Sequence, residues 1–348
     1  MVGVIVANTG SPSSPEPDDI ERYLREFLMD ERIRQLPRPF WKYLVFRHIL
    51  PKRKHSSAKR YRFIWRKEGS PLITIQQRLV DKVQALYDAD VQGGNVKVLS
   101  AMSYGAPCIE DALRELRAMN AERVVLLPLY PQSAYSPTMA VVDSFWRAQD
   151  AVGWHPESTV IDNYHDHPAY IAAMAHALST AGFNADAGDR LLFSFHAIPL
   201  KDEAAGDTYR AQVAASTELI ARELGLSADD IAVSFQSVFG HDESKWTAPL
   251  TRDVLRSWRG GDFRVVMACP GFAVDCLETL YDIPHEMVPC LEGEGAAPVV
   301  TQVGSDIQDA CNTSGRFVWA PSLNDSDEHA RMVKTVIDIA LKPAASRA

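Results

Sequence analysis

The sequence lacks several features that mark large classes of proteins. Its 36 Lys and Arg residues face 45 Asp and Glu residues, so the net charge is −9 and there is no basic surplus. A nucleic-acid-binding protein usually carries such a surplus, so we expect no nucleic-acid partner. No apolar run approaches the roughly 18 residues of a membrane-spanning helix. The first residues, MVGVIVANTGSP, contain no basic segment and predict a strand, not a signal peptide.

Cysteine is scarce and widely spaced. The five cysteines are Cys108, Cys269, Cys276, Cys290 and Cys311, and no C-x-x-C pair occurs among them. This pattern suggests neither a zinc ribbon nor an iron–sulfur motif. A reducing, cytoplasmic compartment is therefore expected.

Motifs for nucleotide binding are also missing, because neither G-x-G-x-x-G after a strand nor G-x-x-x-x-G-K-[ST] occurs. The chain does contain a series of short runs of apolar, β-branched residues. Most of these runs are followed by a segment whose apolar residues recur with the period of a helix. Such alternation predicts an α/β protein with parallel strands. The runs are Gly3–Ala7, Val96–Ala101, Arg123–Pro128, Thr159–Asp162, Leu191–Phe195, Ile231–Phe235, Arg264–Ala268 and Arg316–Trp319.

The runs divide into two halves, which predicts two Rossmann-like lobes, each a parallel sheet flanked by helices. We expect the first lobe over residues 1–153 and the second over 154–315. Residues 316–348 then add a strand and a helix that packs back on the first lobe. Helical stripes are expected at 109–119, 209–224, 247–258 and 327–341. Ligands in such folds bind beyond the carboxyl ends of the strands, so catalytic or binding residues are expected in the loops there.

His196 follows the buried run RLLFSF and should stand at the carboxyl end of a strand. A neutral imidazole can bind a transition metal or accept a proton near pH 7. The alternative is a hydrogen-bonded structural histidine, and the residues alone do not separate the two.

Three acids, Asp275, Glu278 and Asp282, come at spacings that would stack them on one face of a helix. Such a ridge could pass protons outward or a divalent cation inward. A plainer interpretation is that Asp275 is the N-cap of the helix and Glu278 its capping-box partner. Asp282 lies beyond what capping requires.

The segment Leu36–Leu50 is apolar and aromatic, and the stretch Lys52–Lys67 after it holds eight basic residues and no acid. The apolar segment could form a lip that rests on lipid, line a ligand pocket, or be a helix buried between the lobes. The basic stretch fits an anionic small molecule, a membrane surface or a solvated helix face.

Eight motifs, in order, make the chain resemble the ferrochelatase family over nearly its whole length. SFHxIP and PGFxxDxLET are the most specific pair. The motifs are Asn8–Pro12, Tyr23–Asp30, Ser57–Leu72, Tyr130–Gln132, Ser194–Pro199, Gly206–Tyr209, Ser234–Ser237 and Cys269–Leu280. The resemblance implies the chelatase fold, a porphyrin bound in a cleft between the lobes, and Fe²⁺ as a substrate inserted into it to make heme.

The resemblance also implies roles for single residues. His196 would accept pyrrole protons or bind the metal, and Glu278 would be its partner across the macrocycle. Asp275 and Asp282 would continue an acidic path for protons or metal. Ser11, Ser70 and Tyr104 would contact the substrate, with Tyr135 replacing a pocket aromatic. No iron–sulfur cluster is predicted, because no cysteine follows Cys311.

The chain departs from the family pattern at three positions, Ser103, Ser133 and Val238. These departures bear on which tetrapyrrole is used more than on the activity. The long apolar lip favours protoporphyrin IX over coproporphyrin III and suggests peripheral contact with a membrane. Two other functions stay open: a chelatase for another metal and tetrapyrrole, such as Co²⁺, and a tetrapyrrole-binding protein without activity.

Overall fold

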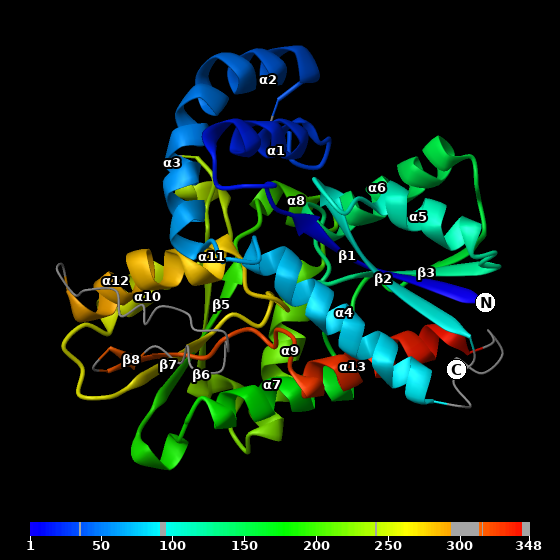
Figure 1. Ribbon diagram of the computed structural model, residues 1–348. Coiled ribbons are helices and arrows are strands. Elements are labelled where there is room, and N and C mark those ends of the chain that lie inside the picture. The colour runs from blue at the N-terminus through cyan, green and yellow to red at the C-terminus, as the bar shows by residue number, and fades with distance from the viewer. Residues whose placement is uncertain (35, 91–94, 241, 294–312, 315, 343–348) are drawn as a thin grey trace. The chain divides into compact units, whose positions relative to one another are not determined.

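The computed structural model describes the chain except for residues 35, 91–94, 241, 294–312, 315 and 343–348 (Figure 1). The chain forms two compact units. The first unit comprises Met1–Asn163 and Asp325–Ala348, and the second comprises Tyr164–Asn324. The chain therefore leaves the first unit after Asn163 and returns to it after Asn324.

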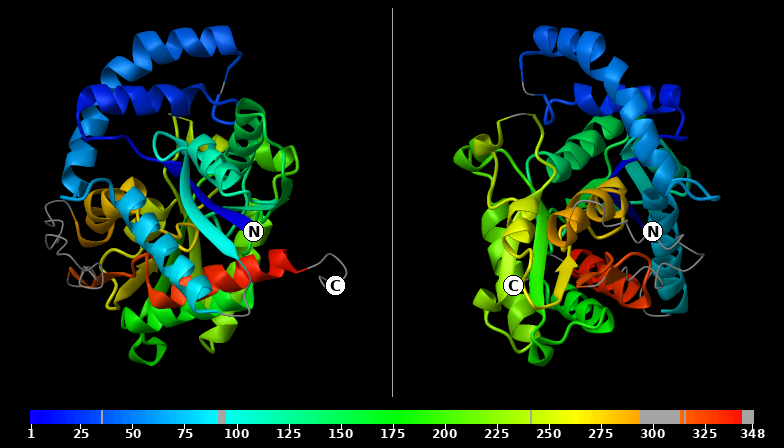
Figure 2. Two further views of the ribbon diagram at one scale, coloured as in Figure 1. Left: turned by 45° about the vertical axis from the view of Figure 1, so that its right-hand side comes forward. Right: turned by 90° about the vertical axis from the view of Figure 1, so that its left-hand side faces the viewer.

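The first unit is built on a parallel sheet of four strands in the order β2-β1-β3-β4. Helices α5 and α6 cover one face of this sheet, and α4 and α13 lie side by side on the other (Figures 1 and 2). Between α5, α6 and the sheet lies an apolar core that includes Ile5, Leu116 and Phe145. The strands are β1 Val2–Gly10, β2 Val96–Tyr104, β3 Arg123–Pro128 and β4 Glu157–Val160.

The second unit has a sheet in the order β6-β5-β7-β9-β8, in which only the edge strand β8 is antiparallel. Both sheets thus confirm the predicted α/β fold with two lobes of parallel strands. The short strand β8 was not predicted. The strands are β5 Arg190–His196, β6 Ile231–Gln236, β7 Val265–Ala268, β8 Thr313–Ser314 and β9 Phe317–Trp319.

Many helices begin with proline in their first turn, where the missing N–H costs no hydrogen bond; α4, α6 and α7 are examples. The helices of the first unit are α1 Pro17–Met29, α2 Arg38–Leu44, the π-helix η1 Val45–Ile49, α3 Leu50–Ile64, α4 Pro71–Ala89, α5 Ile109–Ala118, α6 Pro137–Val152 and α13 Asp327–Leu341. Those of the second unit are α7 Pro168–Thr180, η2 Ala185–Ala187, α8 Leu200–Ala204, α9 Tyr209–Glu223, η3 Ala228–Asp230, η4 Glu243–Lys245, α10 Thr251–Ser257, α11 Leu277–Leu280, the π-helix η5 Ile283–Met287 and α12 Val288–Glu292.

Three of the four expected helices match α5, α9 and α13 to within one residue. The helix expected at 247–258 begins later, as α10 at Thr251. The reason is that the backbone before it serves the sheet edge: Thr247 N–H donates to the Ile198 carbonyl, and the Pro249 carbonyl accepts from Phe235 N–H.

The structure divides the last predicted segment, 316–348, between the two units. Strand β9 pairs with β7 in the second unit, whereas α13 packs on α4 in the first. Lys82 on α4 forms an ion pair with Asp327 at the start of α13. Residue 315, at the predicted boundary, and Cys311, at the start of the cysteine-poor tail, lie outside the described residues. Within the described ranges, no helix has the length and apolar character needed to cross a bilayer.

The close approach of β1 and β2 at their carboxyl ends depends on Gly10. Its φ is 115°, and a Cβ there would lie 2.0 Å from the carbonyl oxygen of Tyr104. We expect Gly10→Ala to lower the free energy of unfolding by about 3 kcal/mol or more, because the strand ends must separate. Gly153→Ala is the control, since Gly153 has φ 62° and open space; it should cost about 1 kcal/mol. Urea denaturation measures both, and equal losses would contradict the argument.

Candidate active site

His196 is the last residue of β5, and its side chain is exposed. Its Nδ1 lies 2.7 Å from the carbonyl oxygen of Ala197. A carbonyl only accepts, so Nδ1 carries the proton in this contact. The neutral ring then presents its lone pair on Nε2, the nitrogen that can take up a proton or bind a metal.

The end of β5 contacts the predicted Gly206–Tyr209 motif through Tyr209. Tyr209 is buried, and its backbone N–H donates to Asp207 Oδ1 at 2.8 Å. Burial raises the pKa of the Tyr209 phenol, and a hydrogen bond from the backbone amide of His196 offsets this only in part. Tyr209 therefore stays neutral where it contacts the backbone of His196. The Phe272 ring lies beside the imidazole, with 6.5 Å between ring centroids.

Glu278 is the second residue of the short helix α11, and its side chain is half-buried. The N-cap of this helix is Cys276, which forms a reciprocal capping box with Thr279. The interpretation of Asp275 as N-cap with Glu278 as its partner is therefore wrong. Glu278 is therefore not the capping-box partner, although its carboxylate contacts the Cys276 thiol. Burial, and then the Glu278 carboxylate, raise the pKa of the Cys276 thiol, so it stays protonated at neutral pH.

Gln236 connects the two candidate residues, and sequence reasoning did not assign it a role. It is paired with His196 in register across β5 and β6. Its Oε1 accepts from the Ser194 hydroxyl at 2.8 Å, and its Nε2 donates to the carbonyl oxygen of Glu278 at 3.4 Å. One buried side chain thus joins the strand of His196 to the helix of Glu278. The sequence signal that could have identified Gln236 was its place within the motif Ser234–Ser237.

The three acids do not form the predicted ridge on one helix face. Helix α11 begins at Leu277, so Asp275 precedes it. Asp275 is 0% exposed and Asp282 is 6% exposed, in contrast to Glu278. Among the residues that the structure describes, no three His, Cys, Asp or Glu side chains form a group that could hold a metal ion.

Two predicted serines of the first unit contact each other. Ser11 follows β1 and Ser70 immediately precedes α4, and the Ser70 hydroxyl donates to that of Ser11 at 2.6 Å. Both side chains are buried. Next to them, Asn8, Thr9 and Tyr130 form a second cluster that received no separate role in the sequence analysis: the Tyr130 hydroxyl donates to Asn8 Oδ1 at 2.8 Å and accepts from Thr9 N–H at 2.9 Å.

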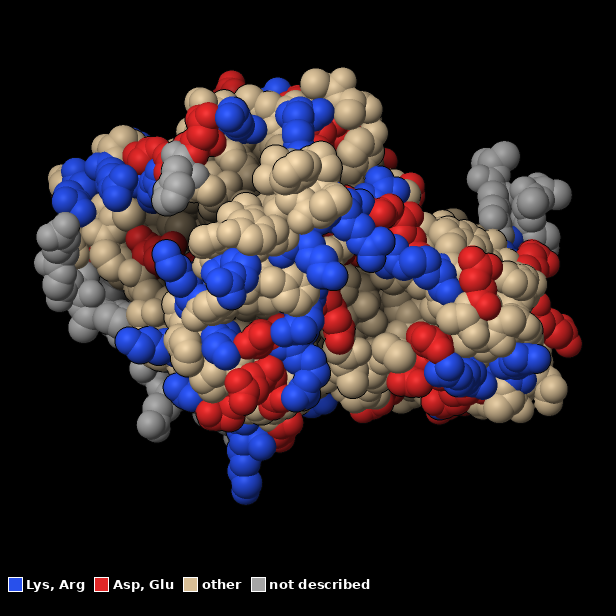
Figure 3. All heavy atoms as spheres, turned by 90° about the horizontal axis from the view of Figure 1, so that it is seen from above, with Lys and Arg blue, Asp and Glu red and all other residues tan. Residues whose placement is uncertain are grey.

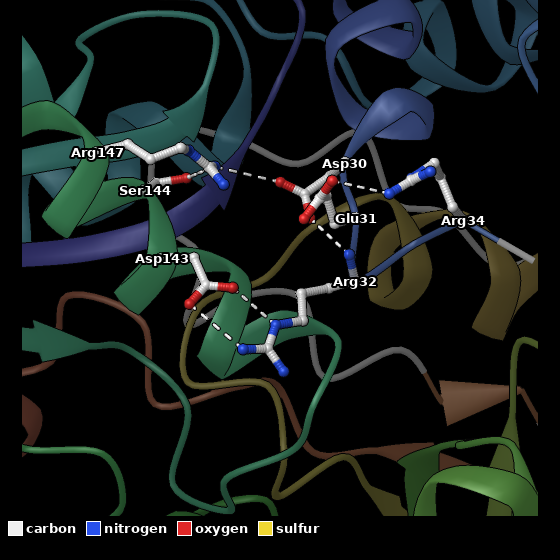
Figure 4. A network of polar contacts seen from close by, with 7 residues as sticks. All are labelled: Asp30, Glu31, Arg32, Arg34, Asp143, Ser144 and Arg147. Atoms are coloured by element: carbon white, nitrogen blue, oxygen red, sulfur yellow. Dashed lines mark hydrogen bonds and ion pairs between the residues drawn. The ribbon is translucent and has the colours of Figure 1, made fainter. Parts of the chain in front are cut away.

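Tyr104 ends β2 opposite Gly10, and it is buried against the edge of the Phe27 ring. Burial, and then the nearby Asp30 carboxylate, raise the pKa of Tyr104, so the phenol remains a neutral donor. Asp30 directly follows α1 and belongs to the network in Figure 4.

That network joins the end of α1 to α6. Asp30 forms an ion pair with Arg147 and accepts from the backbone N–H of Arg32, whose guanidinium pairs with Asp143 at 2.7 Å (Figure 4). Tyr135 is half-buried and close enough to Arg32 to interact with it electrostatically. The network thus connects the surroundings of Tyr104 and Tyr135.

The Ser11–Ser70 contact can be tested by a double-mutant cycle. Each single change, Ser11→Ala or Ser70→Ala, leaves one buried hydroxyl without its partner and should cost about 1 kcal/mol or more of unfolding free energy. The double variant should cost about 1 kcal/mol less than the sum of the singles. Urea denaturation provides the measurement, and strict additivity would show that the two hydroxyls do not interact.

Comparison with known proteins places the chain in a family. The ferrochelatase family profile matches residues 1–341. A ferrochelatase of Nitrosococcus oceani is 35% identical over 338 residues, which covers 97% of this chain and 86% of the relative. A ferrochelatase of Hydrogenovibrio crunogenus is 34% identical over 345 residues, covering 97% and 85%.

Solved structures with a similar fold are chelatases or resemble them. SirB from Bacillus subtilis with Fe³⁺ has a TM-score of 0.52 at 10% identity, over 77% of this chain and 90% of SirB. DR2241 from Deinococcus radiodurans, described as similar to chelatases, has a TM-score of 0.51 at 11% identity, over 97% of this chain and 54% of DR2241. At these identities the likeness concerns the fold alone. The family profile and the two relatives, by contrast, span nearly the whole sequence, and they show that this chain belongs to the ferrochelatase family, the lyases that insert ferrous iron into a porphyrin in heme biosynthesis.

Proposed function

We propose that His196 and Glu278 carry out the insertion of Fe²⁺ into the porphyrin. The observation that supports this assignment is the Gln236 link, which binds the end of β5 to the backbone of Glu278. The strand that carries His196 and the helix that carries Glu278 are thereby joined by one side chain. Two groups that act on one macrocycle need such a fixed relation.

Insertion exchanges two pyrrole protons for one divalent cation, so the site needs a proton acceptor and a group that tolerates the cation. Nε2 of His196 carries the lone pair that can take up a pyrrole proton, and the same lone pair can bind the metal. The Glu278 carboxylate supplies negative charge for the incoming Fe²⁺ or takes up the second proton. We propose that Asp282, which follows Glu278 by one turn, extends the route for protons or metal; the contacts of Asp275 support another role, argued below.

For the first unit we propose that Ser11, Ser70, Tyr104 and Tyr135 bind the tetrapyrrole. Support comes from Ser11 and Tyr104, which lie at the ends of β1 and β2, where ligands of α/β folds bind. Ser70 donates a hydrogen bond to Ser11, and Tyr135 lies in the loop that leads from β3 to α6. The neutral phenol of Tyr104 can pack against an apolar ring and still donate a hydrogen bond. Ser103, one of the departures from the family pattern, offers no positive charge for a propionate.

We also propose that the segment 36–50 contacts a membrane and that the substrate is protoporphyrin IX. The segment is amphipathic: Trp41, Val45 and Leu50 are buried, and Trp41 donates to the Leu28 carbonyl. Phe40 is 70% exposed and Tyr43 64%. Figure 3 looks down on α2 and shows uncharged surface bordered by Lys and Arg.

An apolar face with basic neighbours suits anionic lipid from the cytoplasmic side. Protoporphyrin IX, which carries fewer carboxylates than coproporphyrin III, partitions into the same layer. Of the three roles expected from the sequence for segment 36–50, these observations support the lip that rests on lipid.

The assignment of the site is tested with His196→Ala and Glu278→Gln. Each should lower kcat for Fe²⁺ insertion by about 100-fold or more, because the proton acceptor or its charged partner is lost. The Kd for protoporphyrin, from quenching of protein fluorescence, should change by less than about threefold. The control is Glu223→Gln, an exposed glutamate of α9. Wild-type rates in both site variants would refute the assignment.

The membrane contact is tested with the double variant Phe40→Ser/Tyr43→Ser in a sedimentation assay with vesicles of phosphatidylcholine and phosphatidylglycerol. Loss of two exposed aromatic rings should weaken vesicle binding by about tenfold or more. The matched control, Met119→Ser/Ile339→Ser, removes two other exposed apolar side chains and should bind like wild type. Equal binding by both variants would count against the lip.

A further inference from the structure

The loop before α11 is held by a residue far along the chain, Asn324. Its side-chain Oδ1 accepts from the backbone N–H of Asp275 at 2.9 Å, and its Nδ2 donates to Asp275 Oδ2 at 2.7 Å. Its own backbone N–H donates to the Ala273 carbonyl at 3.0 Å. Asn324 therefore makes three hydrogen bonds to residues 273–275, and both partners of the pair are buried.

The second oxygen of Asp275 is also occupied. Oδ1 accepts from the Thr279 hydroxyl at 2.8 Å and from the backbone N–H of Ser322 at 3.4 Å. Among the described residues, no Lys or Arg forms an ion pair with Asp275. The carboxylate is thus stabilised by neutral donors alone, and it is 0% exposed. A buried carboxylate with both oxygens engaged in hydrogen bonds is built to hold geometry, not to pass protons.

The backbone of Asn324 explains why asparagine suits this position. Its φ is 52°, in the left-handed region where asparagine is enriched among non-glycine residues. Only the amide side chain then offers both an acceptor for the Asp275 N–H and a donor for its carboxylate. Glycine would adopt the same backbone but would lose both bonds.

From Asp275 the contacts continue to the residue beside Glu278. The Thr279 hydroxyl donates to Asp275 and accepts from the backbone N–H of Cys276 at 3.0 Å, which closes the first turn of α11. Glu278 lies in the first turn of α11, directly after this capping turn. Glu278 is therefore oriented through this turn on one side and through Gln236 on the other.

We propose that Asn324, acting through Asp275 and Thr279, is a positioning residue that fixes the Glu278 carboxylate for metal insertion. This inference rests on the proposed function, because it gives Glu278 the role argued there. It also gives Asp275 a different role from the proton or metal path expected from the sequence. Asn324 is the last residue of the second unit. The residue that positions Glu278 therefore lies where the chain leaves that unit.

A swap of the two side chains tests the proposal. Asn324→Asp places two buried carboxylates face to face, and Asp275→Asn places two amides there, so each single variant loses a donor–acceptor match. The double variant Asp275→Asn/Asn324→Asp restores it: the amide at 275 donates to the carboxylate at 324 and still accepts from Thr279. The carboxylate at 324 still accepts from the backbone N–H of residue 275.

We expect each single variant to lower kcat for Fe²⁺ insertion by about tenfold or more, with the protoporphyrin Kd changed less than about threefold. The double variant should recover kcat to within about threefold of wild type. If the double variant stays as slow as Asp275→Asn, the carboxylate is required at position 275 itself and the positioning role is refuted. Wild-type kcat in both single variants would refute it as well.

Thr279→Val and Thr279→Ser keep the test decisive if a swap variant fails to fold. Thr279→Val removes the hydroxyl at nearly constant volume and should reduce kcat in the same way, whereas Thr279→Ser keeps the hydroxyl and should be near wild type. Equal kcat in the two would overturn the proposal. Failure of the proposed function itself would look different, since the wild-type enzyme would then not need Glu278 for Fe²⁺ insertion.

Discussion

The parallel pairing of β5 with β6 and β7 is the constraint on which the candidate site depends. Parallel strands end at the same edge of their sheet, so the last residues of β5 and β6, His196 and Gln236, are placed in register. Their position follows from buried runs such as Leu191–Phe195, whose burial fixes which face and which end each side chain occupies.

Beyond the strand ends, polar contacts and not apolar packing define the site. Gln236 reaches from β6 to α11, and Asn324 reaches from the end of the second unit to the loop before α11. Buried hydrogen bonds of this kind add little net stability but cost much when one partner is missing. They therefore specify one arrangement of the loop around Glu278. This suits the role proposed for Glu278, whose carboxylate must stay in one place while cations and protons move.

Much of the fold could be predicted from the sequence, because buried parallel strands leave β-branched runs that are easy to recognise; each predicted run overlaps an observed strand. His196 and Glu278 could be found as candidates because one ends such a run and the other begins a helix. The N-cap at Cys276 could not, since cysteine is an uncommon cap and Asp275 offered a stronger signal. The role of Asn324 was hidden because its partner lies 49 residues away. The π-helices η1 and η5 have no reliable sequence signal.

The central claim is that this chain inserts Fe²⁺ into a porphyrin. It is tested most directly by anaerobic metal insertion with the wild-type protein, followed by absorbance. Fe²⁺ is offered with protoporphyrin IX and with coproporphyrin III, and Co²⁺ is offered with sirohydrochlorin. We predict turnover of Fe²⁺ with both porphyrins, faster with protoporphyrin IX, and none with Co²⁺ and sirohydrochlorin. Insertion of Co²⁺ into sirohydrochlorin without turnover of either porphyrin would contradict the account.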